Sequence, residues 1–116
     1  MRAEREAGRT CFELCNRHRE RQGLSELRWC ATLHAAAEGR ARAMAGGAML
    51  EPAGATENLA VVEAGGRQPV ELQVANGWLL SGPHRARVEG AFARGAVGVA
   101  RAEVPARYFF SQLLSK

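Results

Sequence analysis

The sequence has no long apolar run, and this absence excludes a helix that spans a membrane. None of its hydrophobic stretches approaches the roughly 20 residues that such a helix needs. The first ten residues, MRAEREAGRT, are charged throughout and lack the apolar segment of a signal peptide. The sequence as written therefore predicts either a cytosolic protein or a protein whose true start lies further upstream.

Lysine is almost absent, since Lys116 is the only one among 16 basic residues and the others are arginines. The 12 acidic residues leave a net charge of +4. Arginine suits phosphate and carboxylate recognition, but here it alternates with glutamate in stretches such as MRAEREAGR and RHRERQ. A nucleic-acid-binding protein gathers its basic residues on one face among aromatic residues. We therefore predict no nucleic-acid partner.

Cysteine is scarce, and the three cysteines cannot all pair within one chain. Cys11 and Cys15 are four residues apart and so lie one above the other on a helix. This spacing is poor for a disulfide and, without a second pair of ligands, poor for zinc. We interpret them as small buried hydrophobic residues, so they do not indicate a redox compartment.

The 116 residues are 47% hydrophobic, which suits one compact domain over residues 1–116. Helical periodicity and turn residues predict four helices, over 3–22, 31–45, 68–80 and 84–89. Short β-rich or alternating patterns predict three strands, near 58–63, 95–103 and 107–115. Helices and strands in this order indicate an α+β domain with an antiparallel sheet.

Five motifs occur in the order that is typical of the CAP superfamily, also called the SCP-like domain. They are NRHRERQGLSELRWCATLHAAAEGRARAMA, TENLA, WLLSGPHRARV, GAVGVA and YFFSQLL. Over residues 11–114 the chain resembles this family, which includes cysteine-rich secretory proteins, plant pathogenesis-related proteins, venom antigens and short bacterial proteins. The resemblance implies a three-layer α–β–α sandwich with a small antiparallel sheet.

The resemblance also implies a central cleft, which in fuller members holds two histidines and two glutamates and can bind a divalent metal. Glu57 matches one glutamate and His84 matches the second histidine. The loop expected to hold the first histidine has none, with Glu51 near its place, and Ser81 replaces the second glutamate. We therefore expect no metal and no cofactor, with zinc at His84 and Glu57 as the alternative.

The candidate cleft residues each have more than one interpretation. His84 either hydrogen-bonds Glu57 across the cleft, which would raise its pKa, or contacts a ligand. Ser81 either caps the short fourth helix or acts as a nucleophile with His84. Asn58 ties a loop, and Arg85 is either solvated or paired with a carboxylate at the rim. The candidate ligand-binding residues are thus His84, Glu57, Glu51, Ser81, Asn58 and Arg85, and we assign no catalytic residue.

The resemblance implies a non-enzymatic binding module for a lipid or sterol-like molecule or for a protein partner. The alternative is a hydrolase, metal-assisted or dependent on histidine and glutamate. The family also implies a location outside the cell or in the cell envelope.

Overall fold

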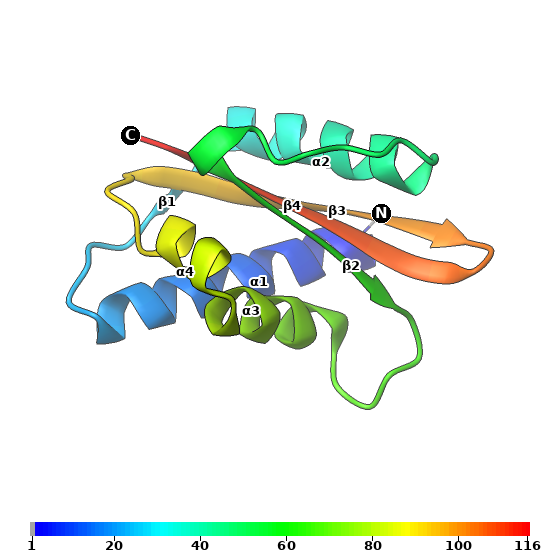
Figure 1. Cartoon of the computed structure of the whole chain (residues 1–116), viewed down its shortest axis with the longest axis horizontal. Helices are drawn as coiled ribbons and strands as arrows, with labels where there is room; N and C mark the ends of the chain where they lie inside the picture. Colours follow the sequence, from blue (N-terminus) through cyan, green and yellow to red (C-terminus); the bar gives the residue numbers. More distant parts are fainter. Residues whose placement is uncertain (1) are drawn as a thin grey trace.

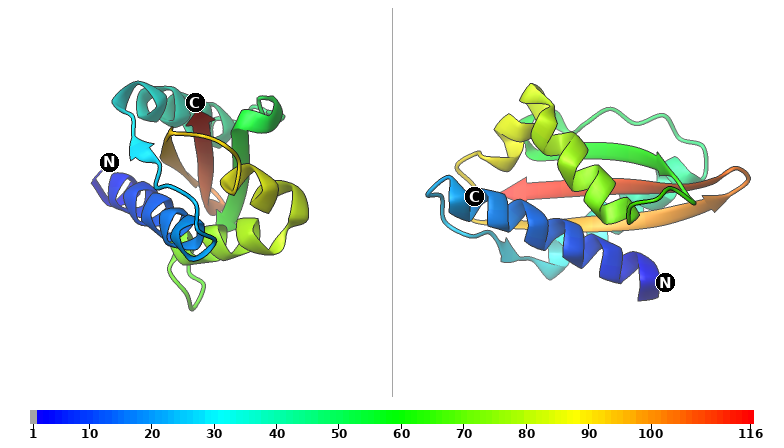
Figure 2. Two further views of the ribbon diagram at one scale, coloured as in Figure 1. Left: turned by 90° about the vertical axis from the view of Figure 1, so that its left-hand side faces the viewer. Right: turned by 90° about the horizontal axis from the view of Figure 1, so that it is seen from below.

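The computed structural model describes residues 2–116 and places one sheet between two layers of helices (Figures 1 and 2). Helix α2 covers one face, and α1, α3 and α4 cover the other. The helices are α1 (Arg2–Arg21), α2 (Ala31–Ala45), α3 (Val70–Leu80) and α4 (Gly82–Val88), with a 3-10 turn at Gly54–Thr56. The strands are β1 (Arg28–Trp29), β2 (Glu57–Glu63), β3 (Arg94–Glu103) and β4 (Ala106–Ser115). The predicted α+β sandwich is confirmed.

The sheet is mixed, with the strand order β1-β3-β4-β2. Strands β2, β4 and β3 pair antiparallel, as the sequence predicts. Strand β1 was not predicted, and it pairs parallel to β3. It has only two residues, too few for a periodic pattern, and it is held by the amides of Arg28 and Cys30, which donate to the carbonyls of Ala93 and Gly95.

Helix α1 ends where the sequence predicts, at a glycine in the left-handed conformation. Gly23 has φ of 75°. The amide of Leu24 donates to the carbonyl of Arg19, and the amide of Gly23 donates to that of Glu20. These two bonds satisfy carbonyls left free at the helix end, and they direct the chain toward β1.

Helix α2 approaches the sheet more closely than any side chain would allow. A methyl group on Gly98 of β3 would lie 2.3 Å from backbone atoms of Ala37 and Glu38. Ala37 and Ala41, on the same helix face, are fully buried. The alanines and the glycine therefore set the distance between this layer and the sheet.

The main core lies on the other face, under α1 and α3. It contains Cys11, Cys15, Val97, Trp78 and Phe110, all almost fully buried. The indole N–H of Trp78 donates to the carbonyl of Leu59 at 3.1 Å and so ties α3 to the outer strand β2. The cysteines are free and buried, as the sequence predicts.

Arg19 joins the two ends of this layer. The residue is only 2% exposed, and its guanidinium donates to carbonyls of Ser25, Val88, Gly90 and Phe92. It thereby links the end of α1 to the turn that follows α4. A hollow of about 460 Å³ lies beside Arg19. The guanidinium already donates to protein carbonyls and so does not offer these donors to a ligand there.

Candidate functional site

The sheet separates the two residues that the sequence places together in a cleft. Consecutive residues of a strand point to opposite faces. Glu57 begins β2 and contacts α2, whereas its neighbour Asn58 contacts α4, which carries His84. Among residues 2–116, no hydrogen bond or ion pair joins His84 to Glu57, so that predicted interaction is wrong.

Glu57 is a fully buried carboxylate with three partners. Nε of Arg40 donates to it at 2.5 Å, the Ser111 hydroxyl at 2.6 Å and the Ala53 amide at 2.8 Å. Arg40 also donates to the carbonyl of Glu51 at 2.9 Å. A buried charge needs such pairing and hydrogen bonding. Glu57 therefore fastens α2 and the 51–53 loop to the sheet.

Asn58 lies in a second buried network on the opposite face. Its amide donates to the carbonyl of His84 at 3.1 Å and to Oε1 of Gln112 at 3.0 Å. Arg87 donates to its carbonyl oxygen at 3.4 Å. Asn58 and Gln112 are both fully buried. Asn58 thus ties β2 to α4, which agrees with the structural interpretation of that residue.

The imidazole of His84 interacts with Ser81 in place of Glu57. The Ser81 hydroxyl and Nδ1 of His84 are 2.7 Å apart. Burial lowers the pKa of His84 from its ordinary 6.5, and the charge of Arg87 lowers it further. This is the opposite of the predicted rise, because no carboxylate stabilises the charged form.

Ser81 stands at the N-cap position of α4, as predicted, but its hydroxyl makes no capping bond. Its backbone carbonyl accepts the amide of Arg85 at 2.8 Å. The Arg85 side chain, 55% exposed, pairs with Glu89 at 3.2 Å. Glu51 is exposed in the loop after α2. The six predicted residues are therefore spread over both faces of the sheet and its rim.

The donor set does not fit a metal ion. Within residues 2–116, no group of three or more His, Cys, Asp or Glu side chains could hold one. Glu57 is occupied by Arg40 and Ser111, and its separation from His84 by the sheet removes the second ligand. A divalent metal at these two residues, the alternative drawn from the resemblance, has no ligand set here.

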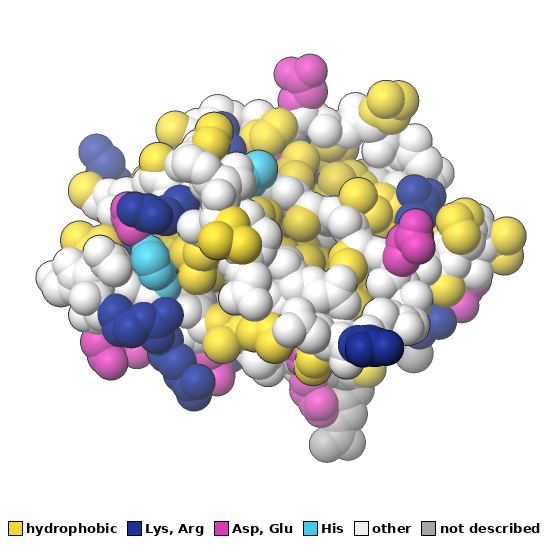
Figure 3. All heavy atoms as spheres, turned by 60° about the horizontal axis from the view of Figure 1, so that its bottom comes forward, with side chains coloured by type: hydrophobic (Ala, Val, Ile, Leu, Met, Phe, Trp, Pro, Cys, Tyr) yellow, Lys and Arg dark blue, Asp and Glu magenta, His cyan; other side chains and the backbone are white. Residues whose placement is uncertain are grey.

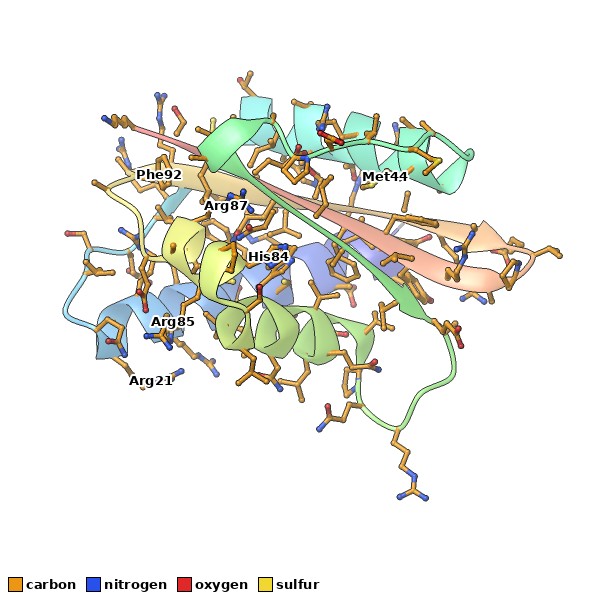
Figure 4. The ribbon with its side chains drawn as sticks, in the orientation of Figure 1. Arg21, Met44, His84, Arg85, Arg87 and Phe92 are labelled. Atoms are coloured by element: carbon orange, nitrogen blue, oxygen red, sulfur yellow. The ribbon has the colours of Figure 1, made fainter. Side chains whose placement is uncertain are left out.

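An apolar pocket of about 330 Å³ lies on the α2 side of the sheet. Figure 4 shows Met44 of α2 and His84 of α4 on opposite sides of that sheet. Met49 in its wall is 98% exposed and Val61 is 55% exposed. The lining residues are Met44, Ala48, Met49, Leu50, Leu59, Ala60, Val61 and Phe109.

Sequence reasoning did not select this pocket or the partners of the buried polar residues. Arg40, Ser111, Arg87 and Gln112 complete the two networks and were not singled out. The usable signal was the alternation of side chains along a strand. It places Ser111 on the same face of the sheet as Glu57, and Gln112 on the same face as Asn58. The pocket combines residues from α2, a loop and two strands, which no local pattern reveals.

On the surface formed by α1, α3 and α4, basic and acidic side chains lie next to each other (Figure 3). Arg85 and Glu89 of α4 and the turn after it form an ion pair at 3.2 Å, and Nε2 of His18 lies 2.7 Å from the same carboxylate. Within the described residues 2–116, no helix combines the length and apolar character needed to cross a bilayer.

Comparison with solved structures shows that the fold is shared with proteins of low sequence identity, including the following three. The platelet inhibitor of a hookworm is 19% identical, with a TM-score of 0.65 over 97% of this chain and 68% of that one. An outer surface protein of Borrelia burgdorferi is 14% identical, with a TM-score of 0.68 over 97% and 94%. A cysteine-rich secretory protein of Staphylococcus aureus is 17% identical, with a TM-score of 0.58 over 96% and 38%.

Sequence comparison gives a family as well as a fold. No curated protein sequence matches the chain. The sequence model of the cysteine-rich secretory protein family, CAP, matches residues 12–114. These residues include strands β1 to β3, all but the last residue of β4, and every helix except the first half of α1. The chain therefore belongs to the cysteine-rich secretory protein (CAP) family.

Proposed function

We propose that this CAP domain is a non-enzymatic binding module that takes a lipid-like molecule into the pocket between α2, β2 and β4. The observation that carries the proposal is the contrast in polarity between this pocket and the cleft that the resemblance implies around Glu57 and His84. The pocket is lined only by uncharged side chains. The side chain of Glu57 is hydrogen-bonded to Arg40, that of Asn58 to the carbonyl of His84, and that of His84 interacts with Ser81.

An apolar ligand suits these walls. Each methylene group that leaves water gains roughly 0.8 kcal/mol. Met44 and Met49 face the pocket, and methionine side chains adapt to irregular apolar shapes. The volume of about 330 Å³ lies at the small end of the range for ligand pockets, which favours a single chain over a bulky ring system.

The proposal places the protein outside the cell or in the cell envelope. The matched family is described as secretory, and one structural neighbour is an outer surface protein. Separating a culture of the source organism into medium, envelope and cytosol, followed by immunodetection, tests this location. Detection in the cytosol alone would contradict it.

Native mass spectrometry with dodecan-1-ol tests ligand binding at the pocket. Val61→Glu places a charge in the wall and should abolish the adduct. Val104→Glu is the matched control, since Val104 is 94% exposed and does not line the pocket. His84→Ala should also keep the adduct. Absence of an adduct with the wild type, or its survival in Val61→Glu, would refute the proposal.

A hydrolase is the second candidate, supported by the 2.7 Å contact between Ser81 and His84. A neutral imidazole can accept the proton of a serine hydroxyl. Glu57, the acid that would orient the imidazole, lies on the other face of the sheet. A fluorophosphonate reagent distinguishes the candidates, because a hydrolase would be labelled at Ser81 and Ser81→Ala would not.

A further inference from the structure

Arg107 of β4 lies beside the apolar pocket and holds a buried donor. Its guanidinium carbon is 5.2 Å from the centre of the Phe109 ring, which lines the pocket. Both residues lie on the α2 face of β4, two positions apart, which is about 7 Å along a strand. Among residues 2–116, no group accepts a hydrogen bond from the buried Nε of Arg107.

Such a donor is unusual in a folded protein. Buried polar atoms are paired in the large majority of cases, and an exception calls for an explanation. The guanidinium is a planar cation whose fork of N–H groups matches a carboxylate. An apolar pocket next to such a cation is complementary to a molecule with an apolar tail and an anionic end.

Glu63 is the acidic residue nearest to this arrangement in the sheet. It lies opposite Arg107 in the pairing of β2 with β4, just as Val61 lies opposite Phe109. Glu63 is exposed, and within residues 2–116 its carboxylate makes no ion pair with Arg107. It leaves the Nε donor free, and it would repel a ligand carboxylate bound nearby.

We infer that the pocket is selective for amphiphiles that carry a carboxylate, and that Arg107 recognises that group. The inference rests on the proposed function and names the ligand class of the same pocket. The apolar tail lies against Phe109, Val61 and Met44, and the carboxylate accepts from the Arg107 guanidinium. Arg107 is thus a specificity-determining residue, and the pocket itself supplies most of the affinity.

Two probes of equal chain length separate the inference from the function on which it rests. Dodecanoate and dodecan-1-ol are titrated below their aggregation concentrations at pH 8, by displacement of a fluorescent apolar probe. The wild type should bind dodecanoate roughly tenfold more tightly, since a hydrogen bond to a charged group outweighs a neutral one. Arg107→Gln should bind both probes equally, with its affinity for the alcohol unchanged.

Arg101→Gln is the matched control, because Arg101 lies on the same hairpin with its guanidinium carbon 5.2 Å from the Tyr108 ring, on the opposite face. It should keep the preference for dodecanoate. Glu63→Gln should increase that preference, and it serves as a second test if Arg107→Gln does not fold. Arg107→Lys keeps the charge without the planar fork and should give an intermediate preference.

The outcomes distinguish the two proposals. Equal binding of both probes by the wild type, or a preference that survives in Arg107→Gln, overturns the role of Arg107 and leaves the lipid-binding function standing. Failure of both probes to bind overturns both. Loss of preference in Arg101→Gln as well as in Arg107→Gln would indicate a response to net charge and would also overturn the inference.

Discussion

At the scale of single residues, Glu57 shows how a carboxylate can be held inside this fold without a metal. Its charge is balanced by Arg40, and its second oxygen accepts from the backbone of Ala53. Replacing one member of a buried ion pair costs much more than replacing an exposed pair, because the remaining charge stays buried.

The first prediction concerns this pair. Arg40→Met should lower the free energy of unfolding by about 2–4 kcal/mol, because it leaves the Glu57 carboxylate buried without its cation. Urea denaturation followed by circular dichroism measures the loss. Arg42→Met is the control, since Arg42 is 65% exposed and lies 3.6 Å from Glu38, and it should cost less than about 1 kcal/mol. Equal losses in the two variants would contradict the role of Glu57.

The second prediction concerns the ionisation of His84. Burial and Arg87 lower its pKa below 6.5, so the neutral form is favoured in the folded state. The resulting stabilisation is present above pH 6.5 and is lost as the pH falls through the lowered value. An NMR titration of the His84 ring should give a pKa below 6.5. In Arg87→Gln the pKa should rise toward its ordinary value, and a wild-type pKa above 6.5 would restore a carboxylate partner.

At the scale of elements, α2 is positioned by small residues. Gly98 allows the backbone of the helix to rest directly on β3. This packing requires a short distance between the helix backbone and β3, and a single added methyl group would force the two layers apart. The pocket is built against the end of α2 and the loop after it, so its shape depends on this contact.

The third prediction follows from that contact. Gly98→Ala should lower the free energy of unfolding by about 3 kcal/mol or more, because its methyl group would meet backbone atoms that cannot rotate away. Gly39→Ala, in α2 with open space around it, should raise stability by about 1 kcal/mol, since alanine favours a helix interior. Thermal unfolding of the two variants should therefore shift in opposite directions. Shifts in the same direction would mean that α2 does not pack as described.

The elements themselves were largely predictable, and the reason is their length. Periods of 3.6 and 2 residues place the second helix at 31–45 and the last two strands within one or two residues of their ends. The two residues of β1 were missed because the partner strand, more than sixty residues away, is what makes them a strand. Local patterns do not carry such pairings.

The site was less predictable than the fold. The sequence identifies Glu57, Asn58, Ser81 and His84 as polar residues at defined positions, and all four make side-chain hydrogen bonds in the structure. It does not say which face of the sheet each helix will cover. That choice, made by the connections between α2, β2 and α4, puts Glu57 and His84 on opposite sides.

At the scale of the whole molecule, three free cysteines mean that the fold is held together without a cross-link. Cys11 and Cys15 are fully buried between α1 and the sheet. The hydrogen bond with Cys15 and burial both raise the pKa of the Cys11 thiol. Free thiols in this protein are thus compatible with an oxidising compartment, because an oxidant cannot reach two of them.

The fourth prediction tests this protection. A thiol reagent of the disulfide type should label the half-buried Cys30 in the folded protein and all three cysteines after denaturation. A reducing agent should leave the melting temperature unchanged. Rapid labelling of Cys11 or Cys15 in the native state would show that α1 separates from the sheet more easily than its packing indicates.

The hydrogen bond from Trp78 to Leu59 has a consequence for how molecules of this protein meet one another. Strand β2 lies at the margin of the sheet, where a strand from a neighbouring molecule could add on. An added strand in register along β2 would have to share or displace the bond that the carbonyl of Leu59 already accepts from the indole. The tryptophan that anchors α3 therefore also limits the growth of the sheet from one molecule into the next.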